Sequence, residues 1–172
     1  MTLCYYLPFI PNPGRRGSAR DERNGLEGLS MAGINYGRVV LGGLVAGVVA
    51  NACDFVSNTY LLAEDMQRMA QRLNLDQAMM NSSSVAITWT VVDFIYALLI
   101  VWTYAAIRPR FGPGPGTAVK AGLVICAAVS AIIFGFVGMG IFTPDTYIKS
   151  LGLSVVSTVL ASLAGGYMYK EA

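Results

Sequence analysis

The sequence predicts an all-α fold, a four-helix transmembrane bundle with a disordered or interfacial N-terminal tail. Of the 172 residues, 55% are hydrophobic and 13% are charged, whereas charged residues make up about 25% of a typical soluble domain. Four apolar runs each reach the roughly 20 residues that a helix needs to cross the hydrocarbon core. Because lipid offers the backbone no hydrogen-bond partners, we expect each run to cross the membrane as a helix, which satisfies its backbone hydrogen bonds internally.

Residues 1–33 form the predicted tail. Its apolar patch, Leu3–Ile10, is too short to span a bilayer and is followed by a stretch rich in proline, glycine and charge. Such a composition buries little apolar surface, so we expect the tail to be disordered or to lie at the membrane interface. Met31 offers an alternative translation start within this region.

The transmembrane domain is predicted to cover residues 34–172, with helices near 38–63, 84–107, 118–142 and 147–169. The first two apolar runs each contain one internal charge, Asp54 and Asp93 respectively. The third and fourth runs have 24 and 20 uncharged residues between the charges at their ends. Each run is therefore long enough for one helical crossing.

The connectors differ in character. Residues 64–80 place methionine and leucine at helical spacing among charged residues, which predicts an amphipathic connector that prolongs the first span or lies on the interface. A methionine-rich partner-binding surface is the alternative for this segment. The run Arg108–Gly116 is rich in proline and glycine and predicts a helix-breaking turn between the second and third spans.

The distribution of basic residues predicts the orientation. With four spans the two termini share one side of the membrane, which carries nine Lys and Arg against three on the other. By the positive-inside rule both termini are cytoplasmic. A cleaved signal peptide ending near Ala50–Cys53 is an alternative for the first span, but the apolar run continues through Leu62 to full spanning length.

Asp54 and Asp93 are the most informative residues, because an antiparallel helix pair brings them to similar depth. Asn51 and Asn58 share a helix face with Asp54. A carboxylate at such depth costs about 2.5–3.5 kcal/mol on insertion scales, and no Lys or Arg lies there to neutralise it. We therefore expect at least one acid to be protonated. This polar cluster is either a proton or cation site, with further oxygens from Ser154, Ser157 or Thr158, or a set of hydrogen bonds that joins the helices.

Small residues recur at helical spacing and predict close helix packing within the chain or between subunits. The packing residues we expect are Gly43, Gly47, Gly135, Ser154, Ala161 and Gly165. The second span instead carries bulky aromatic residues. That face is suited to lipid, to a bound lipid or pigment ligand, or to a partner.

Composition also argues against several functions. The chain has no histidine, so a Ser-His-Asp triad, a Cys-His pair and a histidine-rich metal site are all unavailable. The net charge is only +2 and no basic stripe with interleaved aromatics is present, which argues against nucleic-acid binding. We expect no catalytic residue, no metal site and no obligatory cofactor, and we favour a non-enzymatic protein.

Three segments resemble an uncharacterised family of small four-helix bacterial integral membrane proteins: Gly37–Leu44, Ala63–Met66 and Tyr104–Gly114. The resemblance covers roughly residues 34–172 and implies the four-helix fold and the bacterial inner membrane. It implies no catalytic or binding residue.

The function that the sequence favours is association: an accessory subunit of a membrane complex or a small homo-oligomer, with the lipid bilayer and a membrane-protein partner or a second copy as its contacts. The alternative is a proton- or cation-translocating bundle that uses the intramembrane carboxylates.

Overall fold

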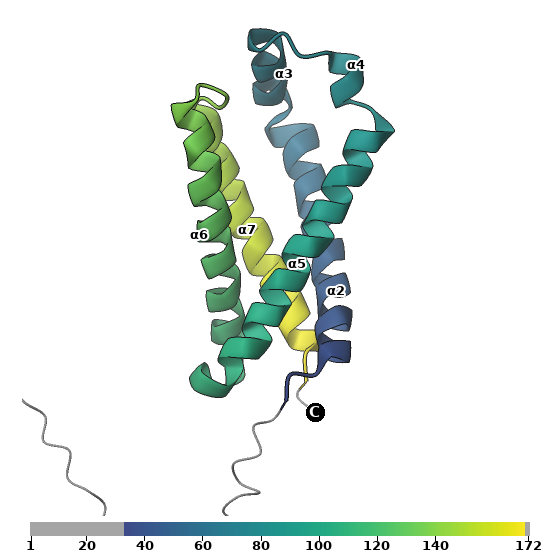
Figure 1. Ribbon diagram of the computed structural model, residues 1–172, viewed down its shortest axis with the longest axis vertical. Coiled ribbons are helices and arrows are strands. Elements are labelled where there is room, and N and C mark those ends of the chain that lie inside the picture. The colour runs from purple at the N-terminus through teal and green to yellow at the C-terminus, as the bar shows by residue number, and fades with distance from the viewer. Residues whose placement is uncertain (1–32, 171–172) are drawn as a thin grey trace, which may run out of the picture. The chain divides into compact units, whose positions relative to one another are not determined.

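The computed structural model describes residues 33–170, and the tail predicted for residues 1–33 lies, apart from Gly33, outside them. Four helices in the described part are long and apolar enough to cross a membrane (Figure 1). They are α2 with its π-helical continuation (Tyr36–Leu61), α5 (Ser83–Phe111), α6 (Pro115–Gly138) and α7 (Pro144–Met168). The predicted all-α, four-helix bundle is confirmed, and the four apolar helices fit a multi-pass membrane protein.

The first span is not one uniform helix. α2 proper covers Tyr36–Val56, and the side chain of Asn35 caps its first turn by accepting the Arg38 backbone N–H at 3.1 Å. The chain then widens into a π-helical turn, η1, over Ser57–Leu61. The backbone N–H of Leu62 closes this turn by donating to the Ser57 carbonyl at 2.8 Å. The sequence predicted an uninterrupted helix over 38–63, because helical periodicity does not reveal one extra residue in a turn.

The amphipathic connector forms two short helices, α3 (Ala63–Arg72) and α4 (Gln77–Met80). Between them Asn74 adopts a positive φ of 50°, a left-handed conformation that asparagine tolerates better than most residues. α3 lies at the end of the bundle opposite the chain ends of the described part (Figure 1). The connector is therefore a separate helical segment that follows the first span after the π-turn.

The turn between α5 and α6 is shorter than expected. α5 continues through Pro109 to Phe111, so the predicted helix-breaking run from Arg108 begins as helix and breaks only at Gly112. Gly112 and Gly114 supply the turn with φ values of 80° and 143°, which side chains rarely allow. Pro115 and Pro144 begin α6 and α7, at a position where a helix needs no backbone N–H. The side chain of Thr143 caps α7.

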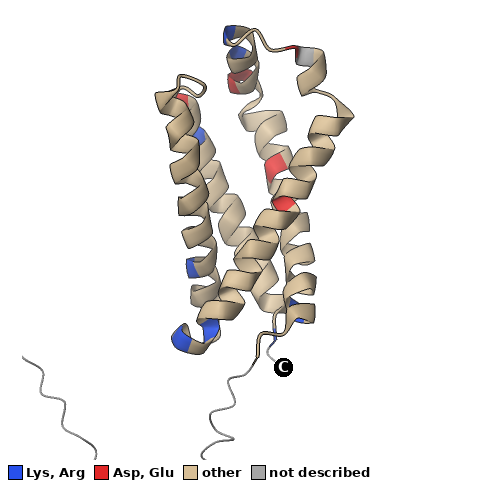
Figure 2. Cartoon of the chain, in the orientation of Figure 1, with Lys and Arg blue, Asp and Glu red and all other residues tan. Residues whose placement is uncertain are grey.

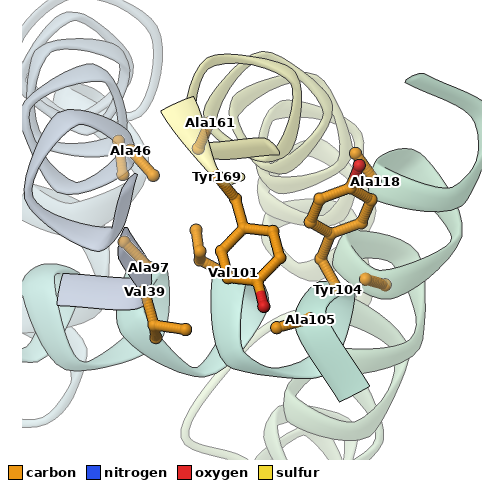
Figure 3. Close-up of a cluster of buried hydrophobic side chains, with 11 residues drawn as sticks. Val39, Ala46, Ala97, Val101, Tyr104, Ala105, Ala118, Ala161 and Tyr169 are labelled. Atoms are coloured by element: carbon orange, nitrogen blue, oxygen red, sulfur yellow. The ribbon is translucent and has the colours of Figure 1, made fainter. Parts of the chain in front are cut away.

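The four long helices pack tightly along only half of their length. Apart from Ser57 in η1 and Thr146 near the start of α7, their buried residues lie within 39–50, 97–105, 117–126 and 157–165. We call the half made of residues 36–50, 97–126 and 157–168 the closed half. Figure 3 shows its core, in which small aliphatic side chains from all four helices surround Tyr104 and Tyr169. These two rings meet edge to face with their centroids 5.8 Å apart.

Glycine determines how closely the helices approach in the closed half. A Cβ on Gly43 or Gly47 of α2 would collide with Leu98 or Phe94 of α5. A Cβ on Gly165 of α7 would lie 3.0 Å from the Gly42 carbonyl oxygen of α2. The same close approach explains the burial of Ala161, which is 0% exposed. Small faces of this kind let helix backbones pack in lipid, where apolar burial alone gives little driving force.

Gly135 and Ser154 differ from these packing residues. Gly135 is exposed on α6, and a Cβ there would meet nothing within 4 Å. Ser154 is only half-buried on α7. Both lie in the other half of the bundle, made of residues 51–61, 83–96, 127–138 and 144–156, which we call the open half. Gly135 therefore makes no close helix contact within the described chain, although α7 lies against α6 nearby through Phe134 and Tyr147.

Candidate functional site

The two intramembrane carboxylates meet where the closed half gives way to the open half. The side chains of Asp54 from α2 and Asp93 from α5 lie close to each other, and the side chain of Ser157 from α7 lies close to Asp54. Figure 2 shows the acidic positions midway along α2 and α5 at similar height. A carboxylate is only an acceptor, so two carboxyl groups can bond each other only if one carries a proton. The proximity of the two carboxyl groups fits the expectation that at least one of them is protonated.

A second polar group extends the pair to the remaining helix. The hydroxyls of Tyr96 on α5 and Thr158 on α7 lie 2.8 Å apart, and the thiol of Cys126 on α6 lies near the Tyr96 hydroxyl. Cys126 in turn lies 3.9 Å from the Ser130 hydroxyl. All four long helices therefore contribute to one polar cluster, which we define as Asp54, Asp93, Tyr96, Cys126, Ser157 and Thr158.

The two asparagines expected beside the carboxylates act locally instead. The Asn51 amide donates to the Gly47 carbonyl, and the Asn58 amide donates to the Asp54 carbonyl, each at 2.9 Å. Asn58 is exposed and lies within the π-turn. Both amides thus satisfy carbonyls one turn back in their own helix, and neither bonds a carboxyl group.

Sequence reasoning missed Tyr96 and Cys126 as members of the cluster. Tyr96 lies three residues after Asp93 and so on the same helix face. Cys126 lies within an apolar run of the third span. A helical-wheel comparison with Asp93 could have found Tyr96, whereas only the packing of α6 could reveal Cys126.

The polar cluster is only partly covered by its own chain. Asp54, Asp93 and Tyr96 are half-buried, whereas Ser157 and Thr158 are 6% and 2% exposed. From Ser157 a groove of about 380 Å³ runs between α2 with η1 and α7 towards the open end. Its lining is mostly apolar and consists of Ala52, Cys53, Val56, Ser57, Leu61, Leu153, Val156 and Ser157. The groove therefore reaches the polar cluster at Ser157.

The cluster contains no obvious metal site. Within residues 33–170, no three side chains of His, Cys, Asp or Glu come together in a way that could hold a metal ion. Two carboxyl groups joined by a shared proton bind cations less readily than two free carboxylates, since the proton occupies an acceptor position. The arrangement is suited to holding or passing a proton and to hydrogen bonding between helices.

Comparison with protein-family models, curated proteins and solved structures finds no match for this chain.

Proposed function

We propose that this protein acts by association within the membrane, as an accessory subunit of a membrane complex or as a small homo-oligomer. The observation that carries the proposal is the incomplete cover over Asp54 and Asp93. A polar carboxyl group that faces hydrocarbon is costly, at about 2.5–3.5 kcal/mol for a charged aspartate on insertion scales. A partner helix over the open half lowers this cost by removing the pair from lipid.

The shape of the open half supports the same proposal. The groove beside Ser157 is lined by small residues of α2, such as Ala52 and Cys53, and has polar groups only at Ser57 and Ser157. Transmembrane helices associate through such small-residue surfaces, with single polar groups that bond across the interface. The dry and fully packed closed half offers no comparable surface, because its glycines and alanines are already used within the chain.

A tryptophan scan of two matched alanines tests the proposal. Ala52 lines the groove, whereas Ala128 is exposed on α6 outside it. Ala52→Trp fills the groove and is expected to shift the protein extracted in native-like lipid discs to a lower mass, while Ala128→Trp leaves the mass unchanged. Native mass spectrometry then tells a second copy from a different subunit. A wild-type mass equal to one chain plus lipid would contradict association.

Proton translocation is the second candidate, and a specific observation favours it. Exchangeable groups gather at this level: Ser157 lies beside the carboxyl pair, and the Tyr96 hydroxyl bonds that of Thr158. Ser162, one turn further along α7, is buried and bonds the Val159 carbonyl at 2.9 Å. Around it the buried side chains of the closed half are largely apolar, so conduction would require that half to rearrange.

Flux measurements separate the two candidates. In proteoliposomes, conduction by the pair predicts a proton flux that Asp54→Asn and Asp93→Asn each abolish while assembly mass is unchanged. Association predicts no flux above that of empty liposomes in the wild type and a loss of assembly when both acids are replaced by leucine.

We also propose the bacterial inner membrane as the location, with both termini cytoplasmic. In the described part, five basic residues lie towards the end of the bundle near the chain ends: Arg38, Arg108, Arg110, Lys120 and Lys170. Three lie towards the opposite end: Arg68, Arg72 and Lys149 (Figure 2). This asymmetry supports the orientation by the positive-inside rule. Reporter fusions after Lys170 and within residues 73–76 are expected to lie on opposite sides of the membrane.

A further inference from the structure

The end of the open half is covered by α3, which is held to the bundle mainly by polar contacts. Asp65 in the first turn of α3 is 7% exposed, and its carboxylate lies 3.3 Å from the ammonium group of Lys149 on α7. Lys149 also pairs with Asp145 at 2.8 Å. At the other end of α3 the Arg72 guanidinium donates to the Ile141 carbonyl in the α6–α7 turn. These contacts connect α3 to a part of the chain that is about 70 to 85 residues away in sequence.

Apolar packing under α3 is incomplete. A cavity of about 330 Å³ lies between α3 and the start of α7, with Met69 and Phe142 among its lining residues. Ala70 is the one apolar residue of α3 that is buried. An element fixed by ion pairs over a cavity is held less firmly than one fixed by a filled apolar interface, because partly exposed ion pairs contribute little and weaken with salt.

The segment that joins α3 to the membrane span has the features of a hinge. The π-helical turn Ser57–Leu61 has five residues where α-helical hydrogen bonding has ended, and Leu62 departs from helical geometry with φ −111° and ψ 0°. π-turns within helices are rare and occur often at functional sites, and hinges are short stretches at element ends that absorb backbone changes. α3 can therefore rotate about this segment without unfolding α2.

The hinge also forms part of the groove. Ser57 and Leu61, its first and last residues, line the groove that ends at Ser157, and Ser157 lies close to Asp54. A rotation of α3 about this turn must therefore change the groove and the path from the open end to the carboxyl pair.

We propose that α3 is a lid over the open half of the bundle, with the π-helical turn Ser57–Leu61 as its hinge and the ion pair between Asp65 and Lys149 as the latch that keeps it closed. Opening admits water to the groove and to the carboxyl pair. The lid is proposed independently of whether the pair conducts protons or binds a partner.

Cys53 provides a native reporter, because it lines the groove and is half-buried. With Cys4 and Cys126 replaced by serine, the rate at which a charged, water-soluble thiol reagent modifies Cys53 in proteoliposomes measures water entry. The thiol reacts as thiolate, which lipid and a dry groove disfavour. Asp65→Asn removes the latch charge without changing side-chain size and is expected to raise the labelling rate by about fivefold.

A matched control and a double variant isolate the latch. Glu64→Gln removes an equal charge from the neighbouring position, which pairs only with Arg68 on the same helix, and is expected to leave the rate unchanged. Lys149→Met should speed labelling as Asp65→Asn does, and the double variant should be no faster than the faster single variant, since both remove one interaction. Equal rates in Asp65→Asn, Glu64→Gln and the parent protein would overturn the proposal.

Two further measurements keep the test decisive if a latch variant folds poorly. Raising salt from about 0.1 M to about 1 M shortens the screening length from about 10 Å to about 3 Å. It should therefore speed labelling of the parent protein. Deletion of the exposed Thr59 converts the π-turn towards α-helix and turns α3 by roughly 100° about its axis, which removes Asp65 from Lys149. Salt-independent labelling of the parent, or a deletion variant that labels as slowly as the parent, would contradict a hinged lid.

Discussion

Replacing Gly165 by alanine tests the packing on which the closed half depends. The added Cβ would lie 2.5 Å from a Val101 methyl and 3.0 Å from both the Ala46 Cβ and the Gly42 carbonyl oxygen. Val101 is fully buried, and neither a Cβ nor a backbone oxygen can rotate away. α7 must therefore move away from α2 by a few tenths of an ångström along their contact.

The size of the effect follows from two opposing terms. Overpacking a well-filled core costs about 1–3 kcal/mol. Alanine is favoured over glycine inside a helix by about 1 kcal/mol, which offsets part of that cost. Gly135→Ala is the matched control, because Gly135 also lies inside a helix and an added Cβ there meets nothing within 4 Å. The difference between the two variants isolates the clash at about 1–3 kcal/mol.

The assay is reversible unfolding in mixed micelles of a mild detergent with increasing dodecyl sulfate, followed by circular dichroism and tryptophan fluorescence. The Gly165→Ala protein is expected to unfold at a dodecyl sulfate fraction equal to or lower than that of wild type. This fraction should also be well below the one at which Gly135→Ala unfolds. Equal unfolding free energies for the two alanine variants would refute the close α2–α7 contact at Gly165.

Three further outcomes follow from the structure. Tyr96→Phe removes the bond to the buried Thr158 hydroxyl and is expected to lower the unfolding free energy by about 1–2 kcal/mol, with Thr158→Val restoring part of this loss in the double variant. Asp93→Asn keeps a donor for Asp54 and should change the unfolding free energy by less than about 1 kcal/mol. Asp93→Leu leaves Asp54 without that donor and should lower the unfolding free energy by about 1–3 kcal/mol. Both variants are measured in the same unfolding assay. Thr143→Ala removes the N-cap of α7 and should cost about 1 kcal/mol, which hydrogen exchange at the backbone N–H of Thr146 can localise.

The fold was predictable from sequence because a chain that crosses lipid must satisfy its own backbone hydrogen bonds. An uncharged run of about 20 residues in lipid has few alternatives to a helix, so the four spans followed from the positions of charged residues. The proximity of Asp54 and Asp93 was also predictable, because antiparallel neighbours of known length place residues at known depth. Gly43, Gly47 and Gly165 lie in close helix contacts as their spacing indicated.

The remaining features depend on tertiary contacts that no local pattern encodes. Asn58 lies within the π-turn Ser57–Leu61 and is exposed, and nothing in the sequence of that turn distinguishes it from α-helix. Cys126 joins the cluster only because α6 packs beside α5 and α7 at that level. The open half was not predictable either, since Gly135 continues a stripe of small residues along α6, yet a Cβ there would meet nothing within 4 Å.

The central claim is that another polypeptide covers the open half in the membrane. A photoreactive amino acid at Ala52 tests it most directly, with the same residue at Ala128 as control, in native membranes and after purification into lipid discs. Association predicts a stoichiometric protein adduct from position 52, either twice the chain mass or the mass of a defined subunit, and only lipid adducts from position 128. Lipid adducts alone from both positions would contradict the account.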